Sequence, residues 1–310
     1  GYLPSDVQLG GKMEINRDAS VAAVQSVADA MGIDLMAAAE GIIKIVNESM
    51  FGALRLVSVE QGYDPRDFAL VGFGGAGPLH ANALGLLTDA WPVIIPPGPG
   101  VLCAYGDATT QVQDEAARTY LTMANDLSDT QLASDLHELE TRAGGALLKD
   151  NIPVSEHEIT YQADLRYAGQ AFQITIDFTE DELKEKGVAL LTDQFDAEHE
   201  QLFTFKLDDG HEILMIRAVA KAKAKSIAEN QIGQTGMGLE ESKIIESRFY
   251  YEGEWHDAII YDRNKLNVGL EVAGPAIVGE MDSTTVVLPG FVATVDAIGN
   301  LLINPVKRGK

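Results

Sequence analysis

The segment with the clearest chemical signature is residues 68–80, Phe-Ala-Leu-Val-Gly-Phe-Gly-Gly-Ala-Gly-Pro-Leu-His. A short apolar run leads into a glycine-rich turn and then into a pattern that opens a helix. Such a turn exposes backbone N–H groups, and the helix dipole adds positive potential at the same place. Phosphate or ribose of a nucleotide is the ligand that suits it. The residues that we assign to this contact are Gly72, Gly74, Gly75, Ala76 and Gly77.

Two common nucleotide motifs do not fit this segment. Gly72-x-Gly-x-x-Gly matches the dinucleotide fingerprint, but that fingerprint needs an acidic residue at the end of the next strand to hold the ribose. The next candidate strand, 93–95, ends in Pro-Pro-Gly, which argues against NAD and FAD. A P-loop is excluded because no Lys-Ser/Thr pair follows the last glycine. The alternative is that the glycines only let a helix and a strand pack closely.

Three separated blocks of the chain carry a family resemblance. They are the run over 57–120, the stretch 164–176 (Asp-Leu-Arg-Tyr-Ala-Gly-Gln-Ala-Phe-Gln-Ile-Thr-Ile) and the stretch 274–291, which begins Gly-Pro-Ala-Ile-Val-Gly-Glu-Met-Asp-Ser-Thr-Thr. In this order they resemble the A-type subunit of the hydantoinase/oxoprolinase family, which also takes in subunits of the ATP-dependent acetone and acetophenone carboxylases.

The resemblance implies a nucleotide-binding fold of which this chain holds one part. The family's ATPase lobe is actin-like (ribonuclease H-like), and its amino-terminal half carries two loops of the form Asp-x-Gly-Gly-Thr-x-Thr-Asp, neither of which occurs here. We therefore expect the carboxy-terminal part of such a subunit, as a fragment or as one piece of a split subunit. The glycine turn would be the adenosine-side loop for ATP, and Mg²⁺ would need the missing amino-terminal lobe.

Further nucleotide contacts are suggested by polar residues near the turn. In actin-like folds a helix before the adenosine loop lends polar side chains to the nucleoside, so Asn47 and Glu48, in a helical pattern over 35–60, are candidates. The alternative for both is a solvated helix face. His80 lies in the first turn of the helix that follows the glycines. It either contacts ribose or phosphate, or it packs and hydrogen-bonds locally.

By this resemblance the function is ATP-dependent ring opening of a cyclic amide, completed on a partner B-type subunit within an oligomer. The alternatives are a subunit of an ATP-dependent ketone carboxylase and, for the isolated chain, a non-catalytic assembly module. We expect an α/β fold with two domains. Residues 1–119 would be the second half of the actin-like lobe, and residues 120–310 a β-rich α+β domain. The catalytic residues cannot be assigned from the sequence.

Composition limits the partners and the compartment. The chain has 310 residues, 46% of them hydrophobic, and a formal net charge of −24. This charge disfavours nucleic acid and anionic membrane, because neutralising phosphates needs clustered Lys and Arg. No apolar run reaches the roughly 18 residues of a membrane span. A single cysteine, Cys103, suits a reducing cytoplasm, and its apolar surroundings predict burial.

Local patterns predict the remaining elements. Helices are expected over 18–31, 78–87, 126–149 and 179–203, and strands over 158–167, 170–178 and 213–225, followed by short strands from 242 onward. A rigid loop is expected after the strand near 94. Arg166, Tyr167 and Gln170 would either bind a carboxylate or a partner subunit, or pin a hairpin. Asp107 and Asp114 are candidates for magnesium or partner contacts, with surface acids as the alternative. No histidine pair has metal-ligand spacing, so we predict no protein metal ligands.

Overall fold

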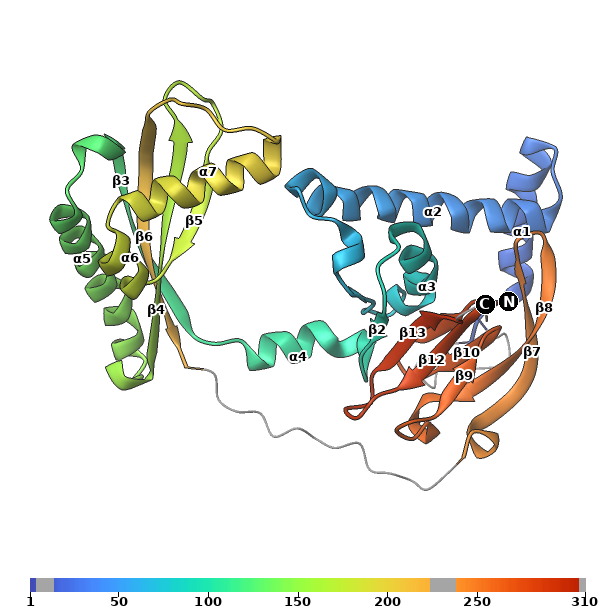
Figure 1. Ribbon diagram of the computed structural model, residues 1–310. Helices are drawn as coiled ribbons and strands as arrows, with labels where there is room; N and C mark the ends of the chain where they lie inside the picture. Colours follow the sequence, from blue (N-terminus) through green and yellow to red (C-terminus); the bar gives the residue numbers. More distant parts are fainter. Residues whose placement is uncertain (4–13, 224–237, 307–310) are drawn as a thin grey trace. The chain divides into compact units, whose positions relative to one another are not determined.

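The computed structural model describes residues 1–3, 14–223 and 238–306, which form two compact units (Figure 1). The first unit combines Gly1–Ala108 with Ala228–Lys310, and the second is Thr109–Ile227. The predicted division was 1–119 and 120–310. The compact units differ from it because the carboxy-terminal residues pair with strands of the amino-terminal part. Each unit is described by itself below.

The helices of the first unit precede and follow the glycine turn along the chain. α1 (Arg17–Met31) begins at Asn16, whose side chain accepts the N–H of Ala19, and ends at Gly32 with φ +68°. α2 (Leu35–Val57) is capped in the same way by Asp34. α3 (Gly77–Thr88) follows the glycine turn, and α4 covers Leu102–Thr109. Within the described ranges, no single helix is long and apolar enough to cross a membrane.

One sheet of this unit combines strands from the amino-terminal and carboxy-terminal parts of the chain. Its order is β1-β2-β13-β12-β9, with β1 parallel to β2 and the other pairs antiparallel. Leu301 of β13 lies opposite Ile95 of β2, so the last described strand joins the strand that follows the glycine turn. The bounds are β1 Leu70–Val71, β2 Val93–Ile95, β9 Glu271–Ala273, β12 Phe291–Val295 and β13 Leu301–Pro305.

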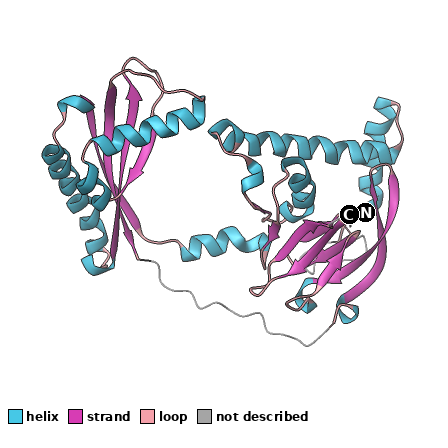
Figure 2. Cartoon of the chain, in the orientation of Figure 1, coloured by secondary structure: helices cyan, strands magenta, loops and turns pink. Residues whose placement is uncertain are grey.

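A second sheet of the same unit has the order β11-β10-β8-β7. The strands of both sheets are drawn in magenta in Figure 2. β10 pairs with β8 in parallel and with β11 antiparallel, so the block 274–291 forms a tight hairpin on its edge. Side chains of both sheets share one hydrophobic core, in which Ile95, Phe249 and Val287 are fully buried or nearly so. The bounds are β7 Lys243–Tyr251, β8 Glu254–Asp262, β10 Ala276–Gly279 and β11 Thr284–Val287.

The second unit is an antiparallel sheet covered by helices, with the strand order β3-β6-β4-β5. α5 (Asp129–Lys149) contacts β3, β4 and β6, and its leucines at 132, 136, 139 and 147 are at most 1% exposed. α7 (Ala189–Phe203) contacts β4 and β5. The other bounds are β3 Gln113–Met123, β4 His157–Tyr167, β5 Ile174–Phe178, α6 Glu180–Lys186 and β6 His211–Ala222.

Most local predictions are confirmed with shifted ends, and three are wrong. The helix predicted over 179–203 is broken at Gly187, and the loop predicted after β2 contains α4. The last proline of that segment is Pro99, and Leu102 and Ala104, which favour a helix, follow it. Cys103 lies on α4, which has no buried residue, and is exposed, not buried. The short 3₁₀ turns are Val59–Gln61, Pro65–Asp67, Pro99–Val101, Ala124–Asp126, Val154–Glu156, Glu240–Ser242 and Arg263–Lys265.

Candidate functional site

The glycine turn connects β1 to α3 and is fixed at its base by backbone hydrogen bonds. The N–H of Gly72 donates to Ile94 O at 2.9 Å, which extends the β1–β2 pairing. The N–H of Gly74 donates to Pro99 O at 2.7 Å, and Gly74 has φ +82°, a conformation that favours glycine. The turn is therefore held against the loop that follows β2.

The glycines of this turn have different roles. A Cβ added at Gly72 would lie 2.7 Å from Ala81 Cβ and from Ile95 Cδ1, so this glycine is required by packing. At Gly74 an added Cβ meets no atom within 4 Å, and at Gly75 it meets only Asp282 O at 3.5 Å. At Gly77 the nearest atom would be Gly72 C at 3.8 Å. The packing alternative thus applies to Gly72, whereas the later glycines border open space.

The turn presents unpaired backbone N–H groups that can donate hydrogen bonds to an anion. Gly75 and Ala76 are exposed, and no hydrogen bond among the described residues uses their N–H groups. α3 starts at Gly77 without a side-chain cap, and Pro78 has no N–H to offer. Unpaired N–H groups at a helix start bind phosphate, carboxylate or hydroxyl oxygens. The donor set therefore fits the nucleotide expected from the sequence.

Asn47 and His80 are brought together beside the turn. Asn47 lies on α2 and is only 8% exposed, and its Oδ1 is 2.8 Å from Nδ1 of the half-buried His80 on α3. Burial lowers the pKa of His80, which favours a neutral ring whose Nδ1–H donates to the amide oxygen. Glu48 is exposed on the same helix and does not join this pair.

A cavity of about 340 Å³ lies next to Asn47 in the first unit. α2, α3 and β7 contribute to its wall, which is mainly apolar. Its lining includes Met36, Ile43, Asn47, Leu79, Tyr250 and Leu288. A concave, mostly apolar wall with a few polar groups is typical of small-molecule sites.

A third segment, which the sequence analysis did not assign to the site, contacts the turn from the β10–β11 hairpin. Glu280 Oε2 accepts the N–H of Gly98 at 3.3 Å, and Ser283 Oγ donates to Gly75 O at 3.4 Å. Burial raises the pKa of Glu280 to about 7, and Asp282 adds to this rise, while Arg263 and the Gly98 N–H oppose it. In the sequence, this contact could have been suspected from the run Gly-Glu-Met-Asp-Ser-Thr-Thr, which places polar residues between two apolar strands.

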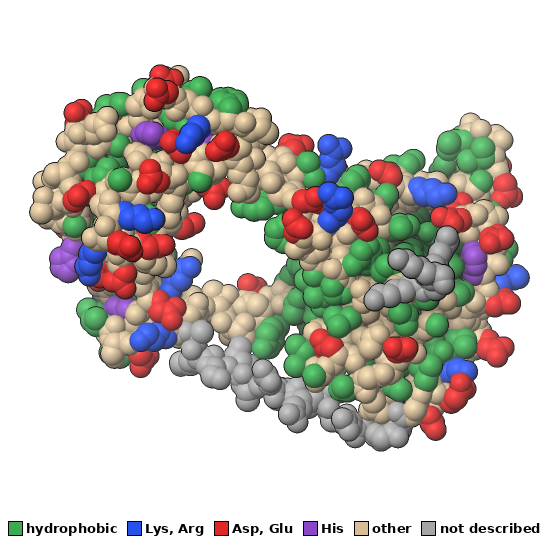
Figure 3. Space-filling model, in the orientation of Figure 1, with side chains coloured by type: hydrophobic (Ala, Val, Ile, Leu, Met, Phe, Trp, Pro, Cys, Tyr) green, Lys and Arg blue, Asp and Glu red, His purple; other side chains and the backbone are tan. Residues whose placement is uncertain are grey.

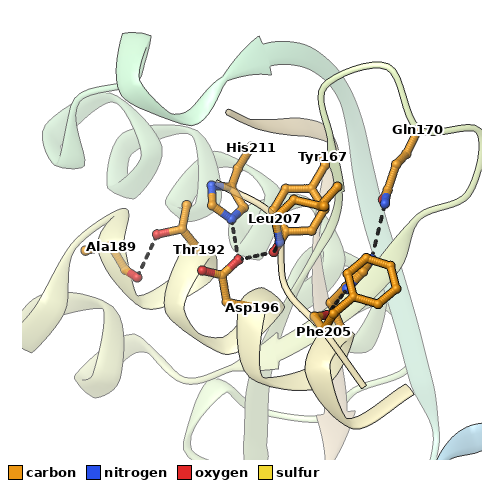
Figure 4. Close-up of polar contacts among 9 residues, drawn as sticks. Tyr167, Gln170, Ala189, Thr192, Asp196, Phe205, Leu207 and His211 are labelled. Atoms are coloured by element: carbon orange, nitrogen blue, oxygen red, sulfur yellow. Dashed lines mark hydrogen bonds and ion pairs between the residues drawn. The ribbon is translucent and has the colours of Figure 1, made fainter. Parts of the chain in front are cut away.

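The Arg-Tyr-Gln group of the second unit has its partners inside that unit, and Figure 4 shows the contact of Tyr167 with Asp196. Arg166 Nη2 forms an ion pair with Glu212 Oε2 at 2.7 Å. The hydroxyl of Tyr167 donates to Asp196 Oδ1 at 2.7 Å, and Gln170 Nε2 lies 3.1 Å from His199 Nε2. These contacts favour the alternative in which the group pins the hairpin.

Asp196 extends this network, because the same Oδ1 also lies 2.7 Å from His211 Nε2. The hydrogen bonds from His211 and Tyr167 lower the pKa of Asp196 against the opposing effect of burial.

Asp107 and Asp114, the candidates for magnesium or partner contacts, are exposed. Among the residues with described positions, no group of three or more His, Cys, Asp or Glu could hold a metal ion.

Comparison with known proteins identifies the family. The hydantoinase/oxoprolinase profile matches residues 1–116, and the profile of the hydantoinase/oxoprolinase C-terminal domain matches residues 123–302. The chain belongs to the hydantoinase/oxoprolinase family. The family resemblance carried by the three sequence blocks is thereby confirmed.

Two of the relatives are named as enzyme subunits. The chain is 28% identical to caprolactamase subunit alpha of Pseudomonas jessenii, over 98% of this chain and 45% of the relative. It is 29% identical to the acetone carboxylase beta subunit of Xanthobacter autotrophicus, over 96% and 43%. An uncharacterized protein of Methanocaldococcus jannaschii is 33% identical over 95% and 42%. The chain therefore spans less than half the length of these hydantoinase/oxoprolinase relatives.

Solved structures agree with this assignment. The ATP-dependent caprolactamase of Pseudomonas jessenii superimposes with a TM-score of 0.82 at 28% identity, covering 98% of this chain and 45% of that one. Nucleotide-free acetone carboxylase gives a TM-score of 0.67 at 24% identity, over 99% and 45%, and shows a shared fold. The mixed α/β architecture with several sheets is thus common to these hydantoinase/oxoprolinase structures.

Proposed function

We propose that this chain is part of the ATP-binding subunit of an ATP-dependent hydrolase of cyclic amides. The observation that carries the proposal is the exposed turn at Gly74–Gly77, with unpaired N–H groups at the uncapped start of α3. The similarity to caprolactamase over nearly the whole chain supports a cyclic amide as the substrate class. Residues 1–119 would then be the second half of an actin-like lobe.

In this proposal each part of the site has a separate task. The N–H groups of Gly75 and Ala76 donate to oxygens of the nucleotide, and the Asn47–His80 pair borders the nucleoside. ATP, when bound, supplies a phosphoryl group that turns an amide oxygen into a leaving group. Mg²⁺ would be held by residues of the wider subunit.

The expected partner is a B-type subunit that completes the reaction. The relatives named above are subunits of caprolactamase and acetone carboxylase, which supports assembly with other chains. Acidic side chains are spread over the drawn face of both units (Figure 3), and the net charge is −24. Basic patches on the partner would be steered toward such a surface.

We predict that the 310-residue chain and a B-type subunit elute together. The measurement is size exclusion with light scattering at low and high salt, after co-expression with the adjacent B-type subunit. Because steering between opposite charges is screened by salt, the complex should weaken at high salt. Separate elution at both salt concentrations, also with an amino-terminal ATPase lobe supplied, would contradict the partner proposal.

Ketone carboxylation is the second candidate, because the acetone carboxylase beta subunit is as similar in sequence as the caprolactamase subunit. The two reactions differ in their co-substrate. ATP turnover that needs bicarbonate together with a ketone would favour the carboxylase, whereas turnover with a lactam alone would favour the hydrolase.

For the isolated chain we predict weak ATP binding and no ATP hydrolysis. The turn provides only backbone donors, and the described residues contain no acidic group of three for a magnesium ion. Phosphoryl transfer needs positioned metal and charge on the phosphates. Phosphate release measured with and without Mg²⁺, next to calorimetric titration with an ATP analogue, tests this. Robust Mg²⁺-dependent turnover by the 310-residue chain would overturn the prediction.

A further inference from the structure

Glu280, at the end of the β10–β11 hairpin, is connected to the glycine turn through two backbone contacts. Its Oε2 accepts the N–H of Gly98 at 3.3 Å. The next residue, Pro99, accepts the N–H of Gly74 at 2.7 Å through its carbonyl oxygen. A buried carboxyl in the carboxy-terminal part of the chain thus supports the loop that holds the turn.

The hairpin touches the same loop and turn at two more points. Ser283 Oγ donates to Gly75 O at 3.4 Å, and Glu280 N donates to Ser283 O at 3.1 Å. A Cβ added at Gly100 would lie 2.7 Å from Asp282 Oδ2, so the loop and the hairpin are in close contact. Movement of Glu280 would therefore be transmitted to both sides of the turn.

The carboxyl of Glu280 is buried and has few hydrogen-bond partners. Oε1 is buried and has no hydrogen-bond partner among the described residues. The charged groups that face it are Arg263, which is only 8% exposed, and Asp282. Arg263 directs Nη2 to the carbonyl oxygen of Gly299, and its Nη1 has no partner in the described part of the chain. No ion pair joins Arg263 to Glu280 among these residues, so the Gly98 N–H is the direct partner of the carboxyl.

We propose that Glu280 is a positioning residue, which holds the loop at Gly98 and through it sets the shape of the Gly74–Gly77 turn. Nucleotide as the ligand of that turn rests on the proposed function. The positioning itself is a property of the folded chain. Burial raises the pKa of Glu280 to about 7, so the closed loop binds the proton of this carboxyl more tightly than an opened loop in which the carboxyl is hydrated. Ionisation therefore favours opening, and the loop is held more tightly below neutral pH than above it.

Hydrogen exchange of the whole 310-residue chain tests the positioning. Glu280→Ala should raise exchange in peptides covering 96–101 and 72–77 by about tenfold, the cost of leaving one buried N–H without its acceptor. Glu280→Gln keeps an acceptor oxygen and should restore most of the protection. Glu271→Gln, an exposed acid on β9, is the matched control and should change neither peptide. If exchange increases in the peptide covering 96–101 but is unchanged in the peptide covering 72–77, the proposed coupling between the loop and the turn is contradicted.

The pH dependence provides a test that needs no folded alanine variant. After correction for intrinsic exchange, protection of both peptides in the unsubstituted chain should be greater at pH 6 than at pH 8, because the closed loop retains the proton of Glu280 at pH 6. In Glu280→Gln this difference should disappear, because the amide does not titrate. Equal protection at both pH values in the unsubstituted chain would contradict the proposal. So would a pH difference that persists in Glu280→Gln.

Titration with an ATP analogue separates the two proposals. If Glu280→Ala loosens the turn and weakens binding, both are supported. If the exchange results hold and the unsubstituted chain binds no nucleotide even at millimolar concentration, the positioning stands and the ligand assignment fails. If binding is unaffected by a loosened turn, Glu280 does not position the ligand contacts.

Discussion

In the intact subunit, Gly75→Val should abolish most nucleotide binding while the chain stays folded, whereas Gly72→Val should destabilise the first unit. At Gly75 a Cβ meets only Asp282 O at 3.5 Å, so valine is accommodated but covers the neighbouring N–H groups. We expect the affinity of the intact subunit to fall at least tenfold, about 1.4 kcal/mol. At Gly72 a Cβ would overlap Ala81 and Ile95 at 2.7 Å, and such overpacking costs about 1–3 kcal/mol.

The two variants are measured by the same pair of experiments. Trp91 and Trp255, which are the tryptophans of the chain, both lie in the first unit, so their fluorescence reports its unfolding. Calorimetric titration with an ATP analogue reports binding. Gly145→Val is the control, because an added Cβ there meets nothing within 4 Å and the site lies in the other unit. Unchanged affinity in folded Gly75→Val would mean that the glycines serve packing only.

The sequence predicted those elements whose signals are local. The helical patterns expected over 35–60 and 126–149, which correspond to α2 and α5, depend on apolar residues only three or four positions apart. The position of β13 has no such signal. Its pairing with β2 joins residues about two hundred positions apart, and a strand of five residues fits many partners. The division of the chain into compact units therefore emerged only from the structure.

The candidate site shows the same limit. Glycine spacing marked the turn, but it did not distinguish Gly72, which packs, from Gly75, which borders open space. That difference depends on side chains of α3 and β2. The polar character of Asn47 was visible, yet its hydrogen bond to His80 spans 33 positions, and the contact of Glu280 with Gly98 spans 182. Long-range contacts of this kind leave no periodic signal.

Arg217→Met is expected to destabilise the second unit by about 3 kcal/mol or more. Its Nη2 lies 2.5 Å from Asp164 Oδ2, and Asp164 is only 1% exposed. Thr175, directly opposite Asp164 on β5, donates its hydroxyl to Oδ1 at 2.7 Å. Removing the guanidinium leaves a buried carboxylate with one neutral hydroxyl as its side-chain donor, and an uncompensated buried charge is costly.

A double variant distinguishes this cause from lost packing. Asp164→Ala with Arg217→Met removes both charges, so it should recover part of the stability that Arg217→Met loses. Since the tryptophans lie in the first unit, hydrogen exchange of peptides from β4, β5 and β6 is the appropriate readout, with fluorescence as the internal control. Lys184→Met removes an exposed ion pair on α6 and should leave exchange unchanged. If the double variant is as unstable as the sum of the single variants, Asp164 and Arg217 act independently, and the buried charge is not the cause.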